Sequence, residues 1–436
     1  MNSEFATLGE PETTGRYIVT FRQGASNEAV AAIMKSAGVK DADLLRSSDF
    51  QESGIDMDQV PAEGGAVLAN LDMAVLNVAP EAAGALAMGA NEESAILAVE
   101  PEGIMHVLSD LRGVSLDYLR GFKDCADSLY ASASTMPPGG EEVADLIEAA
   151  GFADSSTHTW GLAATRAAGS KFTGQGISIA VLDTGLFLQH PDFVGRSIVS
   201  RSFIPGVVSA NDGHGHGSHC TGTACGAYKP AVGPRYGIAH KANIYIGKVL
   251  SDQGSGADGG ILAGIDWAIS NRCHVISMSL GANIPTTTTF YETAGERALS
   301  AGCLIVAAAG NNANRTMKNY GFVTRPANSK TFMAVGAVDG NLKIAYFSAR
   351  DTARSAGTAV DIAAPGVAVY SSWKMPNRYN TINGTSMATP HVAGIAALWA
   401  QASNTRGAAL WHRLITSART LTLPVVDVGR GLVQAP

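Results

Sequence analysis

The sequence of 436 residues is poor in charge, in aromatic side chains and in long apolar runs. Charged residues make up 16% of it and aromatic residues 7%, so long charged and disordered tails are not expected. The formal net charge of -7 gives no basic surface for nucleic acid or for an anionic membrane, and neither is an expected partner. No apolar segment is long enough to cross a bilayer, so no membrane span is expected.

Cysteines are also few. The chain has five of them, an odd number, so at least one thiol has no partner within the chain. They are Cys125, Cys220, Cys225, Cys273 and Cys303. Cys273 and Cys303 each precede a buried-strand pattern, and a disulfide between them is one possibility. The cysteine count does not decide between an oxidising and a reducing compartment.

Apolar residues (46%) and glycines (49) are plentiful, as is typical of an α/β protein with many tight turns. From about residue 158 onward, short apolar strands alternate with helical patterns. This predicts a mostly parallel sheet flanked by helices on both faces, in which ligands bind at the carboxyl ends of the strands. The predicted strands are Ile177–Leu182, Ile244–Val249, Val275–Ser279, Leu304–Ala309 and Phe332–Val335, with an amphipathic helix over Gly259–Asn271.

The first 155 residues divide into three segments. Residues 1–16 lack the apolar core of a secretory signal and are predicted to be a leader or disordered tail. Residues 17–108 predict a small α+β unit. Its expected strands are 17–21, 73–78 and 95–99, and its expected helices are 27–37, capped by Ser26, and 80–88. Residues 109–155 are expected to be a linker or N-terminal extension with helices at 116–130 and 141–150, and residues 156–436 the main unit.

Two motifs bring polar side chains to the expected ligand edge. In Ile179-Ala180-Val181-Leu182-Asp183-Thr184-Gly185, a buried strand ends in a carboxylate, which must be paired or hydrogen-bonded there. The segment 213–223 holds His214, His216 and His219 among glycines. Three close histidines also suggest a hydrolytic zinc site, although no His-Glu-x-x-His is present. The glycines favour another reading, in which a substrate backbone approaches an imidazole at a helix start.

The third motif is Gly384-Thr385-Ser386-Met387-Ala388, extended by Thr389-Pro390-His391. The small and apolar residues that follow Ser386 predict a buried helix with this serine in its first turn. The free N–H groups of a helix start favour developing negative charge. Pro390 is tolerated because it falls close to that start.

Together the three motifs resemble the signatures of the subtilisin-like serine proteases, in that family's chain order of Asp, His and Ser. The resemblance extends from about residue 158 to the C-terminus, and Tyr236–Lys241, Lys248–Leu250 and Cys220 are most similar to the proteinase K branch. It implies a catalytic triad of Asp183, His216 and Ser386. It also implies that Asn311, after the strand Val306–Ala309, and the Ser386 backbone N–H donate to the oxyanion.

The resemblance implies polypeptide substrates that bind by adding a strand between two chain edges. One edge is Gly254, Ser255 and Gly256, and the other is Ser279, Leu280 and Gly281. The walls of the first specificity pocket are Ser279–Gly281 together with Ala308, Ala309 and Gly310. These walls carry no charge, which predicts an apolar or aromatic preference, while the nearby Asp258 is expected to disfavour acidic side chains.

No cofactor is expected for the chemistry itself. Asp361 matches a family position that can ligate one structural calcium ion, the alternative being a solvated or N–H-bonded turn carboxylate. By the same resemblance, residues 17–108 are an inhibitory propeptide whose C-terminal strand is Val99–Leu108 and which is removed by self-cleavage after or near Leu108. Secretion is expected from the family and the propeptide. Two other functions stay open, a non-catalytic binding protein with a protease fold and a zinc hydrolase.

Overall fold

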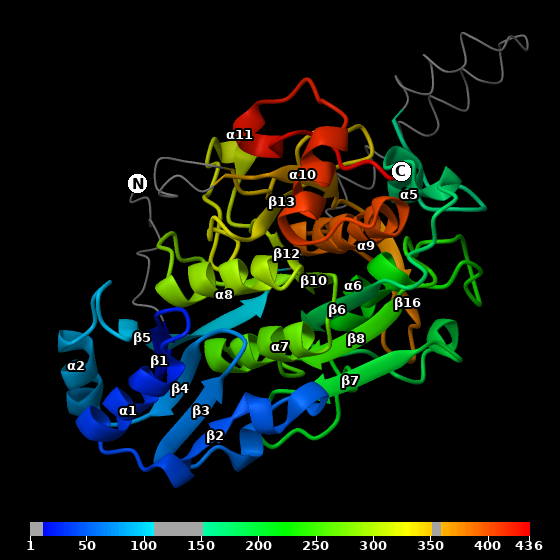
Figure 1. The fold of residues 1–436 in the computed structure, drawn as a ribbon. Coiled ribbons are helices and arrows are strands. Elements are labelled where there is room, and N and C mark those ends of the chain that lie inside the picture. Colours follow the sequence, from blue (N-terminus) through cyan, green and yellow to red (C-terminus); the bar gives the residue numbers. More distant parts are fainter. Residues whose placement is uncertain (1–11, 109–150, 351–358) are drawn as a thin grey trace, which may run out of the picture.

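A computed structural model describes residues 12–108, 151–350 and 359–436 (Figure 1). At its centre is a seven-stranded sheet in the order β14-β13-β12-β10-β6-β8-β7, in which all neighbouring strands are parallel. The strands are β6 (Ser178–Asp183), β7 (Ile198–Ser202), β8 (Asn243–Lys248), β10 (Val275–Met278), β12 (Leu304–Ala308), β13 (Met333–Val338) and β14 (Ile362–Pro365). The mostly parallel α/β architecture expected from the sequence is thus confirmed.

Helices cover both faces of this sheet because its central strands are apolar on both sides. In β6, Ile179 and Val181 belong to one core cluster, whereas Ala180 and Leu182 belong to the other. The first face packs against α6 (His216–Cys225), α9 (Thr385–Ser403) and α10 (Gly407–Ser417). The second packs against α7 (Asp258–Ser270) and α8 (Thr289–Ser300). The strands end together, so their carboxyl ends form one rim.

The strands and the helix predicted for this part of the chain are all present, with ends displaced by at most three residues. The strands β7 and β14 and the hairpin of β15 (Val369–Ser372) and β16 (Tyr379–Ile382) were not predicted. Residues 151–155, assigned to the linker by the sequence, already pack on this unit. The Phe152 N–H donates to Gly340 O at 2.6 Å, and the Trp160 N–H donates to Asp154 Oδ1 at 2.8 Å.

The N-terminal unit is a second, mainly antiparallel sheet with two helices on one face. It contains β1 (Thr13–Phe21), α1 (Ser26–Ala37), β2 (Leu44–Arg46), β3 (Gly64–Leu68), β4 (Met73–Asn77), α2 (Pro80–Met88) and β5 (Ile96–Val107). β1 begins at Thr13, so the last residues of the predicted tail belong to the sheet. The predicted cap is wrong, since the Ser26 Oγ–H donates to Asp72 Oδ1 and caps no N–H group of α1.

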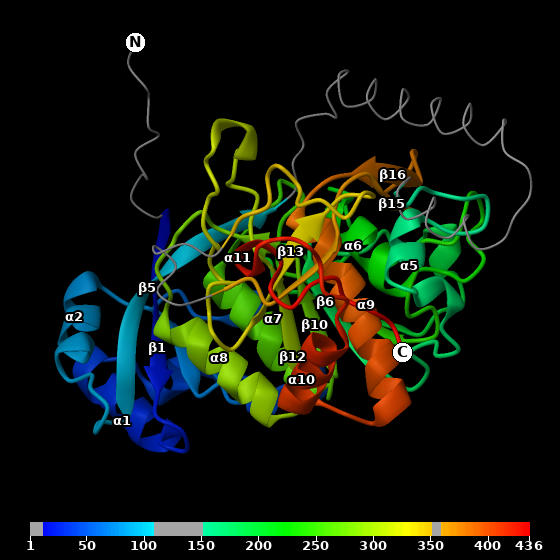
Figure 2. The ribbon, with the colours of Figure 1, turned by 90° about the horizontal axis from the view of Figure 1, so that it is seen from above.

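Strand β5 (Ile96–Val107) joins the two units and runs through both the strand predicted at 95–99 and the C-terminal strand expected at 99–108. Its first half pairs with β1, beside which it lies in Figure 2. Its end runs between β9 (Ser255–Ala257) and β11 (Leu280–Gly281) of the C-terminal unit. Helices α7 and α8 therefore lie between the two sheets (Figure 1). This places Leu108, the residue after β5, at the rim of the parallel sheet.

Two further expectations concern cysteines and membranes. The possible disulfide between Cys273 and Cys303 is wrong for this structure, since both thiols are free and buried, as are Cys220 and Cys225. Within the described ranges, no helix has the length and apolarity needed to cross a membrane. The helices predicted at 116–130 and 141–150, together with Cys125, lie outside the described residues.

Candidate active site

Asp183 is the last residue of β6 and is 1% exposed. Its Oδ1 accepts hydrogen bonds from the Thr184 N–H at 2.7 Å and from His216 Nδ1 at 2.7 Å. A buried carboxylate needs such partners. Strand β6 thus places a charged hydrogen-bond acceptor at the rim, where the His216 imidazole is bonded to it.

His216 is the first residue of α6 and is fully buried. The glycines on either side of it are required by close packing. A Cβ atom at Gly215 would lie 2.3 Å from the Trp373 ring, and one at Gly217 would lie 2.2 Å from Gly185 O. These glycines therefore let the helix start fit between β6 and the β15–β16 hairpin.

Asp212 positions this helix, and the sequence analysis missed it. Its Oδ1 accepts from the N–H groups of His214 (2.9 Å) and Gly215 (2.8 Å), and its Oδ2 accepts from the Ser218 N–H (2.9 Å) and Oγ–H (2.7 Å). An acidic residue before a glycine-rich helix start is a capping signal. That signal was present in the sequence just before Gly213.

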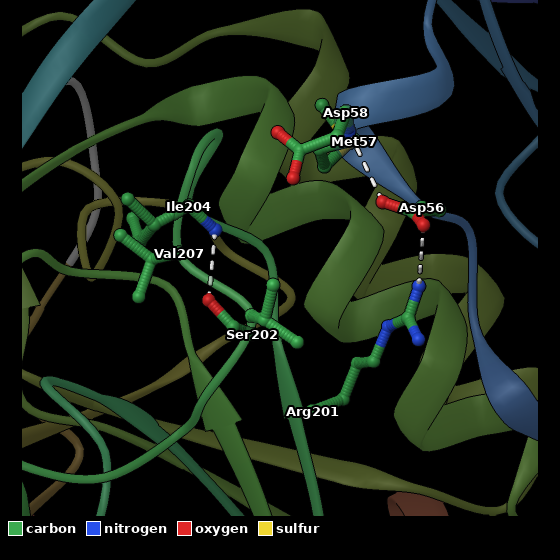
Figure 3. Close-up of a pocket in the computed structure, with 8 residues that line it drawn as sticks. Asp56, Met57, Asp58, Arg201, Ser202, Ile204 and Val207 are labelled. Carbon is green, nitrogen blue, oxygen red and sulfur yellow. Dashed lines mark hydrogen bonds and ion pairs between the residues drawn. The ribbon is translucent and has the colours of Figure 1, made fainter.

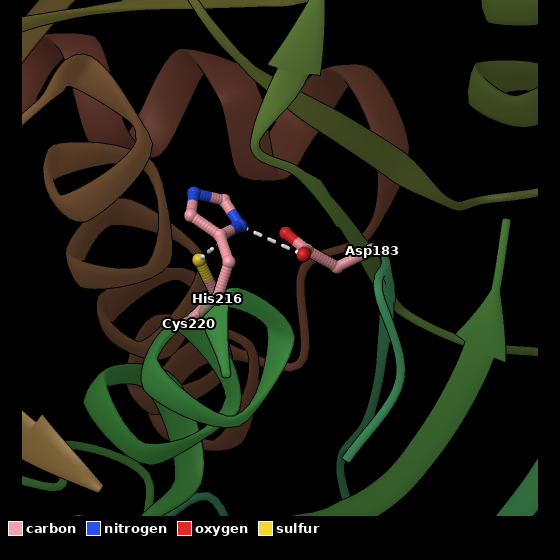
Figure 4. A group of neighbouring side chains, drawn as sticks. All are labelled: Asp183, His216 and Cys220. Carbon is pink, nitrogen blue, oxygen red and sulfur yellow. Dashed lines mark hydrogen bonds and ion pairs between the residues drawn. The ribbon is translucent and has the colours of Figure 1, made fainter. Parts of the chain in front are cut away.

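Asp183 strongly affects the pKa of the buried His216. Burial lowers the pKa of His216, but the adjacent Asp183 carboxylate outweighs it and holds the pKa well above its ordinary value of 6.5. Cys220, one turn further along α6, lies with its Sγ 3.9 Å from His216 Nδ1, as Figure 4 shows. Burial raises the pKa of the Cys220 thiol, so it stays protonated.

Ser386 lies in the first turn of α9, as predicted, and is fully buried. Its Oγ–H lies against the carbonyl oxygen of Leu108 and 3.1 Å from that of Ser279. Its own carbonyl oxygen accepts from Cys220 Sγ at 3.5 Å, so α6 and α9 meet at this cysteine. His216 Nε2 is buried without a hydrogen-bond partner, and the serine hydroxyl is not bonded to it in this arrangement.

Asn311 also contacts Leu108. Its Nδ2 donates to Leu108 O at 2.7 Å. Its Oδ1 accepts from the Thr385 N–H at 3.0 Å and from Thr385 Oγ1 at 2.9 Å, which fixes the direction of the carboxamide. The side chains of Ser386 and Asn311 thus meet at one carbonyl oxygen, although they are far apart in the sequence.

The two predicted edges flank the end of β5. Its residues Met105 and His106 pair with Gly256 and Ser255, and Val107 and His106 pair with Leu280 and Gly281. Two more hydrogen bonds continue this pairing, from Val107 N to Gly254 O at 2.9 Å and from Leu108 N to Ser279 O at 3.4 Å. β5 is therefore bound as an added strand between two edges of the C-terminal unit.

The Leu108 side chain enters the region of the expected specificity pocket. A Cβ atom at Gly281 would lie 2.9 Å from Leu108 Cδ1, so this glycine leaves room for the side chain. Ala308 and Ala309 are fully buried at the end of β12, which neighbours β10. Their role as the opposite wall, with Gly310, remains a prediction.

The three histidines form no group of possible metal ligands among the described residues, although the rings of His214 and His216 lie 6.2 Å apart. His219 Nε2 is bonded to Val369 O at 2.9 Å, and burial lowers its pKa to about 3. In the part of the chain that the structure describes, the one group of three possible metal ligands is Asp183, His216 and Cys220, within 4.8 Å of one another. Two of these three groups already use their donor atoms on each other, since His216 Nδ1 is bonded to Asp183 Oδ1 at 2.7 Å.

Asp361, the predicted calcium position, is hydrogen-bonded in this structure. Its Oδ2 accepts from the Ala334 N–H at 2.8 Å, and its backbone O accepts from the Arg430 N–H at 2.9 Å. Burial raises the pKa of this carboxyl to about 7. These contacts match the alternative of an N–H-bonded carboxyl, and calcium binding here stays a prediction.

The start of α9 with Ser386, the buried Asp183–His216 pair and the Asn311 carboxamide lie together at the rim of a parallel sheet, an arrangement compatible with a serine hydrolase of α/β type. Residues 174–431, more than half of the chain, match the subtilase family. The chain belongs to this family and is a subtilisin-like serine endopeptidase.

Similar proteins agree with this assignment. An alkaline protease of Alkalihalobacillus alcalophilus is 38% identical over 71% of this chain and 75% of its own length. Subtilisin Savinase of Lederbergia lenta is 42% identical over 55% of this chain and 82% of its own. Alkaline elastase YaB of a Bacillus species is 39% identical over 67% and 73%. The predicted likeness to the proteinase K branch stays a prediction.

Proposed function

We propose that this endopeptidase cleaves peptide bonds through an acyl-enzyme formed on Ser386, with His216 as general base and Asp183 as its orienting partner. The observation that supports this proposal best is the position of the Leu108 carbonyl. Its oxygen lies against Ser386 Oγ and accepts a hydrogen bond from Asn311 Nδ2, as the carbonyl of a bound substrate would. The residues before it are paired like a substrate strand.

The proposed steps follow from these contacts. A rotation of the Ser386 side chain brings its Oγ–H to the free Nε2 of His216, which takes the proton as Oγ attacks the carbonyl carbon. Asn311 Nδ2 and the Ser386 backbone N–H then stabilise the oxyanion. His216, held by Asp183, returns the proton to the leaving amine, and water releases the acyl group by the reverse sequence.

The same arrangement supports a proenzyme. The bond that follows the bound carbonyl is Leu108–Ser109, so we propose that the chain cuts itself there and that residues 17–108 are an inhibitory propeptide. Before and after this cut, β5 occupies the edges that a polypeptide substrate needs, and activity requires its departure. Secretion fits such a proenzyme and is proposed with it.

The test is the full-length chain with Ser386→Ala beside the unchanged chain. The unchanged chain should yield a fragment that begins at Ser109 and should hydrolyse casein, in a manner blocked by a serine-directed inhibitor and not by a chelator. The variant should stay uncut and inactive. A cut and active variant, or activity lost to the chelator alone, would refute the serine mechanism and favour the zinc alternative. An inactive, folded wild-type chain would favour a binding protein.

A further inference from the structure

Lys248, the last residue of β8, has its side chain inside the C-terminal unit and is 1% exposed. Its backbone is fixed to β7, since Ser202 is its partner in the parallel pairing and the Phe203 N–H donates to Lys248 O at 2.8 Å. Figure 3 shows Ser202 at this end of β7, with its Oγ accepting from the Ile204 N–H at 3.3 Å. An ammonium group buried in this way needs hydrogen-bond acceptors inside the protein.

The Lys248 ammonium group has two such acceptors, and they belong to different segments of the rim. Nζ donates to Thr184 O at 2.5 Å and to Asp252 Oδ1 at 2.7 Å. The same Asp252 Oδ1 also accepts from the Gly213 N–H at 3.0 Å. Burial raises the pKa of Asp252, but the hydrogen bonds from Lys248 and Gly213 outweigh it and hold the pKa below the ordinary value of 3.8. The acceptor is therefore charged at neutral pH.

Thr184 connects this ammonium group to the buried carboxylate and to the start of α6. Its N–H donates to Asp183 Oδ1 at 2.7 Å. Its Oγ1 accepts from the Gly217 N–H at 2.8 Å, and the Oγ1–H donates to Asp212 Oδ1 at 2.9 Å. The carbonyl that Lys248 holds thus belongs to the residue that bonds both halves of the catalytic pair's surroundings.

Asp252 connects the same ammonium group to a substrate edge. It lies in the turn 251–254, in which the Gly254 N–H donates to Ser251 O at 3.0 Å and the Ser251 N–H donates to Ser255 O at 2.8 Å. This turn leads directly into β9. Gly254 O accepts from the Val107 N–H at 2.9 Å, so the turn itself takes part in binding the added strand.

Stability is a poor explanation for this buried lysine. Taking an ammonium group out of water costs free energy, and a partner that is 49% exposed, as the Asp252 side chain is, returns little of it. An apolar side chain would fill the same space without that cost. An apolar side chain could not, however, join Thr184 O and the Asp252 carboxylate at one point. The role of Lys248 that these contacts favour is to connect the two segments.

We propose that Lys248 is a positioning residue, whose ammonium group keeps the Asp183–His216 pair aligned with the edge at which the substrate strand binds. The proposal rests on the acyl-enzyme mechanism proposed above, in which His216 must reach the serine that faces the bound carbonyl. A peptide paired along β9 cannot shift to follow a displaced imidazole, whereas a short substrate can. Lys248 therefore matters most for substrates that extend along the edges.

The experiment compares two substrates on the full-length chain after it has cut itself. One is the peptide Met-His-Val-Leu, which copies residues 105–108, and the other is leucine alone. Both are blocked at the amino end and joined to the same reporter amine. Lys248→Met removes the ammonium group and keeps the apolar stem, and Lys241→Met, at an exposed lysine, is the matched control. Titration with a serine-directed inhibitor counts the active enzyme, so that misfolded protein does not lower the measured kcat.

For Lys248→Met we expect kcat to fall about a hundredfold on the peptide, as a misplacement of about 1 Å can cause, and by no more than about tenfold on the leucine substrate. Asp252→Ala should show the same preference for loss on the peptide, with a smaller size. Asp252→Asn keeps an oxygen acceptor for Lys248 and should recover most of that loss. Lys241→Met should match the wild type on both substrates.

The outcomes separate this proposal from the mechanism on which it rests. Equal losses on the two substrates, or no loss on the peptide, would refute the positioning role and leave the acyl-enzyme mechanism in place. A folded wild-type chain that cleaves neither substrate would refute the mechanism and the positioning role together. If Lys248→Met fails to fold or to cut itself, Asp252→Ala decides by the same comparison, because it changes an exposed side chain.

Discussion

The carboxamide of Asn311 is fixed at its oxygen by Thr385 and free to donate at its nitrogen, which here meets Leu108 O. We expect Asn311→Ala to lower kcat with little effect on KM, because the donor matters most when the oxygen becomes charged. The loss should be about 3 kcal/mol, a magnitude borrowed from subtilisin, a member of this family in which such a side-chain donor has been removed.

Steady-state kinetics on a peptide substrate measures this loss. Asn314→Ala is a matched control, since Asn314 accepts a local bond from Thr316 Oγ1 in a loop. An equal fall in both variants, or a rise in KM alone for Asn311→Ala, would contradict a role in transition-state stabilisation.

The pH dependence of activity should follow His216, which must be neutral to act as a base. Because Asp183 raises its pKa well above 6.5 despite burial, kcat/KM should rise with pH through a midpoint above 6.5. Asp183→Asn removes the charge that raises this pKa, so the midpoint should move to lower pH. The rate should fall about ten-thousandfold, as known for the same change in a serine protease of another fold.

A pH–rate profile of both enzymes gives the midpoints. Glu296→Gln, which neutralises an exposed carboxylate on α8, should leave the profile unchanged. An Asp183→Asn midpoint equal to that of the wild type would show that another group controls the acid limb.

Individual residues also show how much of the site could be predicted from the sequence. The motifs that contain Asp183, His216, Ser386 and Asn311 resemble the family's signatures, and that resemblance gave these residues their catalytic roles, which stay a prediction. The Ser386 hydroxyl lies against Leu108 O and is not bonded to His216 Nε2. This position could not be predicted from the sequence. It depends on which carbonyl fills the cleft, and no local pattern encodes that.

At the scale of elements, central strands were easier to predict than edge strands. β6, β10 and β12 are apolar on both faces, and such runs are visible in a sequence. β7 is the edge strand of its sheet and has a mixed, partly exposed sequence, so it carried no clear signal. The apolar pattern of β5 alone predicted only residues 95–99, because Glu100-Pro101-Glu102-Gly103 interrupts it, and its continuation to Leu108 was expected from the family resemblance. Glu102 is nevertheless fully buried, since it pairs with Arg16 and accepts from the Gly259 N–H.

Because of the Asp258 carboxyl at the start of α7, we expect propeptide binding to depend on pH. Asp258 accepts from the Gly103 N–H at 2.8 Å and from Tyr291 OH at 2.6 Å, with Glu102 and Arg325 as its charged neighbours. Burial raises its pKa from 3.8 to about 7. The complex therefore favours the protonated acid. The complex should therefore be strongest at low pH and weaken as pH rises through about 7, where Asp258 loses its proton.

Asp258→Asn removes this titration while keeping the shape of the side chain. Release of the N-terminal fragment that ends at Leu108, measured by size-exclusion chromatography across this range, should be faster at higher pH in the wild type and nearly independent of pH in the variant. Asp252→Asn, a carboxylate close to the cleft but not bonded to β5, serves as the control. An unchanged pH dependence in Asp258→Asn would exclude this carboxyl as its source.

At the scale of the whole molecule, the described fold does not depend on disulfides, because its four described cysteines are all free thiols. Burial raises the pKa of Cys225 and of Cys303 to about 12, so neither offers a reactive thiolate. We expect a thiol reagent to react with these four cysteines only when the chain unfolds, and a reductant to leave the melting temperature unchanged. Fast reaction of more than one thiol in the native protein would contradict this; Cys125 lies outside the described residues.

The shared strand β5 has a consequence for the propeptide once it has left. From Ile104 to Val107, its backbone is paired on both sides only while β9 and β11 hold it. A freed propeptide therefore exposes bare N–H and C=O groups along this stretch, and unpaired strands of that kind readily recruit other chains. The discarded propeptide should be short-lived in solution, either digested by the enzyme that it inhibited or lost to self-association.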